Sequence, residues 1–425
     1  MAVAYRPHFS SSHRAVDAAL WACLAIGGTQ LVPLPPAIRL ALSPASAFVD
    51  AQLLLEQPAS ANAWRPISLD PESTAWALAL AAACMLLFWA ARHIFERRGG
   101  LRTIARGAAA GGLVVSIVTF VQRAVAPHLF YGLWRPVAGA DTLTPFGPFL
   151  NRNDMATWLI MALPLAGGYA MARIHSRGRG SALEDIVDEG TVWLTGSLCL
   201  MTAVLLASTS RSGIIGGAVG LLMLLMLGRG RITGRQFLWM LAGVIVLGVA
   251  ATAYVNVPAL TARFDAIFGP DLGRGRLTIW RQTWPMARDF WRTGIGVGAF
   301  RRGMLAYEQR PFDLFFNHAH NEYLQLLVEG GVPLAVAAGF AILAGWREAA
   351  SRLRHDTTSM GWTRAGAAAG LVAVAVQSVW DTGLRMPANA VLFAVMAAVA
   401  LHSRHDAAAR HDHADAALRQ GDSRG

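Results

Sequence analysis

The stretch TVWLTGSLCLMTAVLLASTSRSGIIGGAVGLLMLLMLG, residues 191–228, contains a single charged residue, Arg211. On either side of the short link 209–212 lie two apolar runs, 191–208 and 213–228. Runs of this length cross the hydrocarbon core of a bilayer as helices, because a helix satisfies its own backbone hydrogen bonds where water is absent. The stretch therefore predicts two membrane helices joined by a tight turn, and an all-α polytopic membrane fold.

The same pattern recurs along the chain and predicts about ten membrane helices. The expected spans are 15–33, 74–92, 107–126, 154–172, 191–208, 213–228, 236–255, 330–346, 365–380 and 388–402. A further apolar piece at 37–55 is broken by Pro44 and contains Asp50. It is interpreted as re-entrant or interfacial, which leaves a range of 10–12 crossings open.

Composition supports this class of protein. Of 425 residues, 54% are hydrophobic and 15% are charged, which is too apolar for a soluble domain. The chain has no lysine, so its 37 basic residues are arginines, and they fall between the apolar spans instead of along one helix face. That distribution argues against nucleic-acid binding despite the net charge of +11. The three cysteines lie inside apolar spans without zinc or redox spacing.

The arginine-rich connections predict the orientation, since such segments stay cytoplasmic. They lie at 92–106, 173–179, 229–235, 347–364 and from 404 onward, and they alternate with the other connections. Both termini are thus expected in the cytoplasm. The predicted organisation is a cytoplasmic segment 1–14, a single membrane domain 15–402 with a periplasmic loop 256–329 between helices seven and eight, and a disordered tail 403–425.

The polar run FFNHAHNEYLQLLVEGGVP, residues 315–333, is the strongest candidate for a functional site. Two histidines, two asparagines and two carboxylates are costly at a membrane boundary unless they are hydrogen-bonded or used. Helix capping by Asn317 is the competing interpretation. A helix that begins near Asn317 would place His320 in its first turn.

Four further polar segments lie at predicted span ends or in the long loop. Residues 145–156 carry Asn151, Asn153 and Asp154 at an expected helix start; Asn153 or Asp154 is the candidate cap, and capping and function of the phrase are both open. Arg211 is either a phosphate ligand or a residue that snorkels to the lipid headgroups. Residues 273–300 combine arginines with three tryptophans, as expected of an amphipathic helix on the membrane surface. Residues 377–390 carry Asp381 and Arg385, for which an ion pair at a helix end is favoured.

Several of these phrases resemble the O-antigen ligase and O-antigen polymerase family. The similar features are His320-Asn321 followed by Gly331, the Gly-x-Phe-x-Asn-x-Asn phrase at 147–153, the triplet at 211–213, and the loop from Arg276 to Gly298. The resemblance implies a fold of the GT-C glycosyltransferase type. It also implies His320 as the catalytic residue and Arg211, Arg276 and Arg281 as diphosphate ligands, with His318, Asn321, Asn151, Asn153 and Asp381 in supporting roles.

The expected function is transfer of a glycan from a polyprenyl diphosphate carrier to a sugar hydroxyl at the periplasmic face of the inner membrane. The acceptor is lipid A-core or a growing polysaccharide, and the resemblance leaves ligase and polymerase open. No Asp-x-Asp motif occurs, so arginines are expected to replace a metal, and no cofactor is expected. A transporter or flippase of a lipid-linked saccharide, a protein O-glycosyltransferase and a membrane scaffold without activity are the alternatives.

Overall fold

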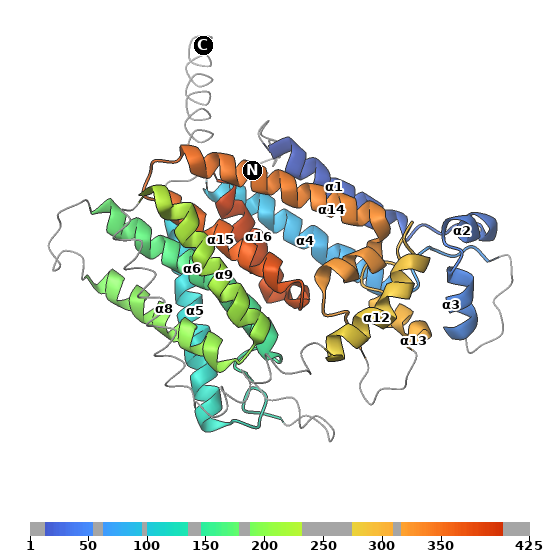
Figure 1. Cartoon of the computed structure of the whole chain (residues 1–425), viewed down its shortest axis with the longest axis horizontal. Helices are drawn as coiled ribbons and strands as arrows, with labels where there is room; N and C mark the ends of the chain where they lie inside the picture. Colours follow the sequence, from blue (N-terminus) through green and yellow to red (C-terminus); the bar gives the residue numbers. More distant parts are fainter. Residues whose placement is uncertain are drawn as a thin grey trace, which may run out of the picture. The chain divides into compact units, whose positions relative to one another are not determined.

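The computed structural model describes residues 13–53, 63–95, 100–134, 146–177, 188–231, 274–308 and 316–402 (Figure 1). Within these ranges the chain forms helices, with isolated bridges such as Leu34 to Arg65 and no strand. The all-α prediction is therefore confirmed for the described residues. The predicted span 236–255 and the predicted disordered tail 403–425 lie outside them.

Six helices are long and apolar enough to cross a membrane. They are α4 (Pro71–Phe95), α5 (Gly100–Val125), α6 (Arg152–Ser176), α8 (Glu189–Ala207), α9 with the short helix η2 (Arg211–Arg231), and α14 (Glu322–His355). Four of them contain an expected span in full, and α5 and α8 each end one residue short of theirs. The protein is thus a multi-pass membrane protein.

Three other expected spans are helices, but shorter ones. They are α1 (Arg14–Thr29), α15 (Gly361–Gln377) and α16 (Pro387–Ala400), with 16, 17 and 14 residues. At 1.5 Å per residue they are about 21–26 Å long, less than the roughly 30 Å of a hydrocarbon core. The count of ten crossings and the GT-C fold therefore stay predictions.

The segment 37–55 folds as two short helices, α2 (Pro36–Leu42) and α3 (Ser46–Leu53), separated around Pro44. Neither is long enough to span a bilayer. Arg39 donates to the Asp50 carboxylate at 2.7 Å and Arg65 does so at 3.3 Å, so the charge that interrupts the apolar run is paired. These helices agree with the re-entrant or interfacial interpretation and exclude one continuous helix here.

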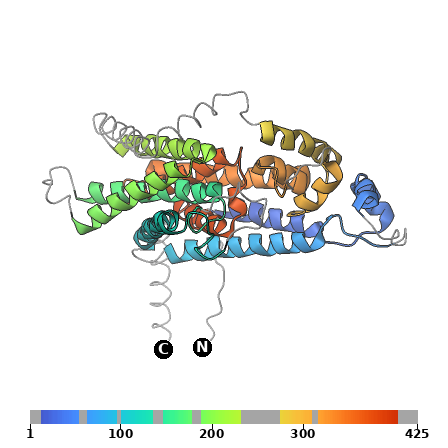
Figure 2. The ribbon, with the colours of Figure 1, turned by 90° about the horizontal axis from the view of Figure 1, so that it is seen from below.

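The chain divides into two compact units. The first comprises Met1–Met85, Asp271–Glu348 and Ser378–Thr382, and the second comprises Leu86–Pro270, Ala349–Gln377 and Gly383–Gly425. In the second unit, α15 packs along α6, α9 and α16, and these helices lie side by side in both views (Figures 1 and 2). A Cβ at Gly366 of α15 would lie 2.2 Å from the Pro164 carbonyl oxygen of α6. Glycine therefore permits the two backbones to touch, as is common between membrane helices.

The first unit is built around α12 (Arg274–Asp289), α13 (Phe300–Tyr307) and the first part of α14. Buried apolar side chains join α12 and α13 to α3 and α14: Val49, Met286, Ala287, Phe290, Ile295, Ala299, Phe300, Met304, Ala319 and Val328. The helix expected in the arginine-rich segment 273–300 is thus present as α12. Its placement on the membrane surface stays a prediction.

Helix α14 is broken at Gly331, which has φ +65° and ψ −173°. The break lets the Val332 amide donate to the Trp291 carbonyl, while a Cβ at Gly331 would lie 2.8 Å from the Gly294 nitrogen. A Cβ at Gly294 would in turn lie 2.1 Å from the Glu329 carbonyl oxygen. The glycines on both segments are therefore needed for close backbone contact, and this contact fixes the first turns of α14 against the loop after α12.

Candidate functional site

The turn that precedes α14 carries the two histidines. The helix begins at Glu322, and the Asn321 side chain caps it by accepting from the Leu324 amide at 3.0 Å. The competing interpretation, in which Asn317 caps the helix, is therefore wrong, because Asn321 supplies the capping oxygen four residues later. His320 consequently lies in the turn and not in the first turn of the helix.

His320 adopts the left-handed conformation, with φ +50°. Such a backbone costs on the order of 1 kcal/mol for a residue with a Cβ and persists where the surroundings hold it. Here hydrogen bonds hold the turn on both sides of His320. The Trp280 indole donates to the Ala319 carbonyl at 2.9 Å, and the Glu322 amide donates to the Ser378 carbonyl at 2.9 Å. The turn thus presents His320 in one fixed backbone conformation.

The His320 ring faces a buried carboxylate. Its Nδ1 lies 4.0 Å from Asp381 Oδ1, and the Arg276 Nη2 lies 3.9 Å from Asp381 Oδ2. The Asp381 side chain is 4% exposed, whereas the His320 and Arg276 side chains are 35% and 32% exposed. One buried anion is therefore flanked by two groups that are accessible from outside.

This arrangement matches that of a histidine oriented by a carboxylate. The 4.0 Å separation exceeds hydrogen-bond length, and catalytic contacts are often this loose without substrate. His320 Nδ1 is buried and has no hydrogen-bond partner among the described residues, and the Asp381 carboxylate lies 4.0 Å from it. A proton on Nδ1 would face Asp381, which leaves Nε2 as the nitrogen able to accept a proton from a substrate.

A second polar network lies beside the turn and was not predicted from the sequence. Gln325 is 1% exposed and its side chain contacts Ala319, His318 and Glu329, the last of which is also 1% exposed. The four-residue spacing of Gln325 and Glu329, which places them one turn apart on a helix, is the sequence feature that could have indicated this pair. Both residues stand in a segment whose other positions are mostly apolar, so the pattern indicated only a helix.

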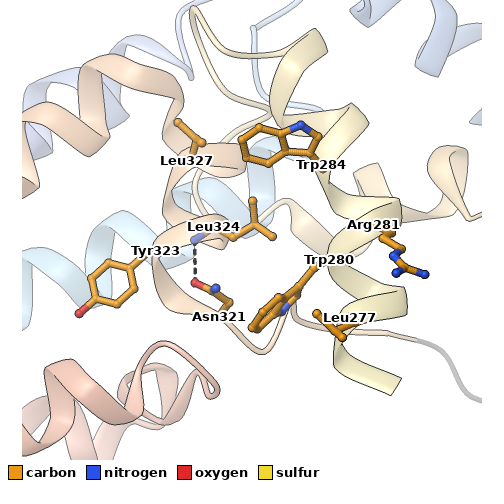
Figure 3. A pocket seen from close by; sticks show the side chains of 8 residues that line it. All are labelled: Leu277, Trp280, Arg281, Trp284, Asn321, Tyr323, Leu324 and Leu327. Atoms are coloured by element: carbon orange, nitrogen blue, oxygen red, sulfur yellow. Dashed lines mark hydrogen bonds between the residues drawn. The ribbon is translucent and has the colours of Figure 1, made fainter. Parts of the chain in front are cut away.

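A groove of about 600 Å³ runs between α12 and α14 next to this turn (Figure 3). Its walls are mainly aromatic and leucine side chains, and its full lining is Leu277, Trp280, Arg281, Trp284, Asn321, Tyr323, Leu324 and Leu327. In Figure 3, Leu324 lies between the two tryptophans of α12, and the Arg281 guanidinium is drawn away from Tyr323. The groove thus offers an apolar surface beside a polar residue, Asn321, that adjoins His320 in sequence.

The other candidate residues belong to the second unit. Asn151 is the N-cap of α6 and accepts from the Asn153 amide at 2.9 Å, so capping falls to Asn151 and not to Asn153 or Asp154. Arg211 is the exposed first residue of α9, whose cap is Ser210. The structure therefore brings His320, Asp381 and Arg276 together in the first unit, and it places Asn151, Asn153 and Arg211 at helix starts of the second.

The fold and this site define a multi-pass membrane protein with a histidine in the turn before α14, a buried carboxylate from the segment after α15 and an arginine of α12. Residues 196–339 match the family model described as O-antigen ligase. The resemblance drawn from the sequence motifs to the O-antigen ligase and polymerase family is thereby confirmed over these residues, which include Arg211, Arg276 and His320. The match implies glycan transfer of the ligase or polymerase type. No curated protein matches the chain.

Proposed function

We propose that the chain is an inner-membrane glycosyltransferase that moves a glycan from a polyprenyl diphosphate carrier to a sugar hydroxyl of lipid A-core or of a growing polysaccharide. The observation that carries the proposal is the contact between the His320 imidazole and the buried Asp381 carboxylate, which also faces Arg276. The family match over 196–339 supports the reaction class. The geometry supports a specific division of roles.

In the proposed step, the acceptor hydroxyl oxygen forms a bond to the anomeric carbon of the donor sugar. The bond from that carbon to the diphosphate oxygen breaks, and its electron pair stays on the diphosphate. His320 accepts the hydroxyl proton as general base, and the Asp381 carboxylate stabilises the imidazolium that forms. Direct displacement of this kind inverts the anomeric centre.

Arginines hold the leaving group in this proposal. Arg276 lies beside Asp381, and Arg281 lines the groove on the same helix. A guanidinium donates two parallel hydrogen bonds to phosphate oxygens and remains charged at all relevant pH values. We assign Arg276 and Arg281 to the diphosphate from this placement, and Arg211 from the family motif. No separate acid is required, because a diphosphate bound in this way leaves as a stabilised anion.

We assign the groove between α12 and α14 to the isoprenoid part of the donor. Its tryptophan and leucine lining favours a hydrocarbon chain, which leaves water when it binds. Arg281 and Asn321 lie in the same lining. The diphosphate would then lie at the end of the groove that is nearest His320.

The proposed location of the site is the periplasmic face, with both termini in the cytoplasm. The alternation of arginine-rich connections supports this orientation. Reporter fusions at Gly230 and Arg352 are expected to report cytoplasm, and a fusion at Arg302 is expected to report periplasm. A reversed signal at Arg302 would remove the site from the side on which the donor is presented.

The experiment that tests the function measures product from purified lipid-linked donor and saccharide acceptor in detergent. We expect His320→Ala to lower the rate about 10²–10⁴-fold, as is typical of a lost general base. His318→Ala is the matched control and is expected to retain partial activity. EDTA is expected to have no effect, because the diphosphate is assigned to arginines. A parent enzyme that moves the donor across a bilayer without forming product would identify a transporter instead.

A further inference from the structure

Gln325 is an amide buried in the first turns of α14, and every polar group on its side chain has a partner. Its Oε1 accepts from the Ala319 backbone amide at 3.0 Å. Its Nε2 donates to Glu329 Oε1 at 3.0 Å and lies 3.2 Å from His318 Nδ1. A primary amide has two N–H donors, so one is available for each of these two acceptors.

These partners fix the orientation of the amide. The Ala319 N–H requires an acceptor, so the Gln325 oxygen must face the turn, and the NH₂ group must then face Glu329 and His318. His318 Nδ1 acts as an acceptor in this network. The His318 ring is therefore engaged in holding the turn, in contrast to the ring of His320, whose Nδ1 faces Asp381.

Ala319 is the residue directly before His320, so the Gln325 contact acts on the backbone that carries the candidate base. The left-handed φ of His320 persists only while its neighbours are held. Trp280 holds the Ala319 carbonyl, and Gln325 holds the Ala319 amide. The two contacts fix both polar groups of one peptide residue, and Gln325 is itself fixed by Glu329.

We propose that Gln325, oriented by Glu329, is a positioning residue that sets the place of the His320 ring relative to Asp381. This inference rests on the proposed role of His320 as general base. Misplacement of a catalytic group by about 1 Å lowers rates by about 10²-fold. Loss of the Gln325 contact is therefore expected to lower turnover and to leave donor binding unchanged, since Gln325 is buried and, among the described residues, its side chain makes its hydrogen bonds to the turn and to its own helix.

The test exchanges the glutamine and the glutamate between positions 325 and 329. Gln325→Glu keeps an acceptor for Ala319 but places a carboxylate opposite Glu329, and it is expected to lower kcat about 10–100-fold with the donor KM within about twofold. Glu329→Gln keeps an acceptor for Gln325 and is expected to have a small effect. The double variant Gln325→Glu/Glu329→Gln restores a donor opposite an acceptor. It is expected to recover most of the kcat that Gln325→Glu loses.

The matched control is Gln282→Glu, which also places a carboxylate at a buried glutamine, on α12. If Gln282→Glu lowers kcat as much as Gln325→Glu, or if the double variant shows no recovery, the positioning role is wrong. Gln325→Met, which is uncharged and of similar length, replaces Gln325→Glu if the latter does not fold. Equal kcat in Gln325→Met and the parent would likewise overturn the proposal.

A second readout separates this inference from the proposed function. The ring signals of ¹³C-labelled histidine are recorded by NMR, and the His320 signal is assigned by its loss in His320→Ala. Gln325→Glu is expected to shift the His320 signal, and the double variant is expected to return it. A parent enzyme without transferase activity but with these shifts would refute the proposed function alone. An unshifted His320 signal would refute the positioning role, whatever the activity.

Discussion

The turn at 318–321 and the interface between α6 and α15 are held in place by different kinds of contact. At the interface, glycines such as Gly366 and Gly168 leave room for neighbouring carbonyl groups, and regular helices continue on both sides. At the turn, a histidine takes a left-handed conformation and side-chain hydrogen bonds hold it. The difference shows that the bundle is stabilised by packing of small residues, whereas the candidate site depends on a few specific polar contacts.

The largest effect is expected from a substitution at the interface between α6 and α15. Gly366→Leu would place side-chain atoms into the Pro164 carbonyl, since even a Cβ would lie 2.2 Å from it. Because the obstacle is backbone, it cannot move aside as a flexible side chain would. We expect a loss of stability of about 3 kcal/mol or more, with little folded protein recovered. Size-exclusion profiles and thermal unfolding in detergent measure this loss.

The matched control is Gly196→Leu on α8. A Cβ at Gly196 would meet no heavy atom within 4 Å, and leucine favours a helix more than glycine does. This variant is expected to fold as the parent does. If both leucine variants unfold alike, close packing at Gly366 is not what stabilises the bundle.

At the turn, Arg276→Lys is expected to lower transfer activity without unfolding the protein. Lysine keeps the charge beside Asp381 but loses the planar fork that binds two phosphate oxygens. The loss of one charge-assisted hydrogen bond, about 1.5–3 kcal/mol, corresponds to about 10–100-fold in rate. Arg288→Lys, at an exposed position of the same helix, is the control and is expected to be silent. Equal rates for the two variants would contradict the diphosphate role of Arg276.

The smallest effect is expected at Asn151, which caps α6 in place of the expected Asn153 or Asp154. The side chain caps α6, so Asn151→Ala is expected to cost about 1 kcal/mol of stability, and Asn151→Ser is expected to retain most of it. Thermal unfolding of the two variants tests the cap. If Asn151→Ser is fully stable yet loses transfer activity, Asn151 also contributes to the site.

Much of the fold could be predicted from the sequence, because a long apolar run leaves the backbone few alternatives to a helix. The helix ends were harder to predict. Helix α15 begins four residues before the expected span 365–380 and ends three residues before that span does, and α16 ends at Ala400, two residues before its expected end. The break at Gly331 was also missed, because its cause is contact with Trp291 and Gly294, which lie nearly 40 positions earlier in the chain.

The site was predicted only in part. The sequence motifs selected His320, Arg276 and Asp381, and the structure brings these three together. The start of α14 could not be chosen from the sequence, since both Asn317 and Asn321 are good capping residues and only the folded turn distinguishes them. Gln325 was not recognised, and Glu329 was recognised only as a carboxylate of the polar run 315–333, because their proposed positioning role depends on burial, which one sequence does not reveal.

The most direct test of the account is a single-turnover measurement with enzyme saturated by the lipid-linked donor, comparing His320→Ala with the parent. Saturation removes differences in donor affinity, so the rate after acceptor addition reports the chemical step alone. If His320 is the general base, this rate falls about 10²–10⁴-fold while donor affinity is unchanged. An unchanged single-turnover rate together with weakened donor binding would contradict this assignment, because His320 would then be a ligand for the donor and not the base.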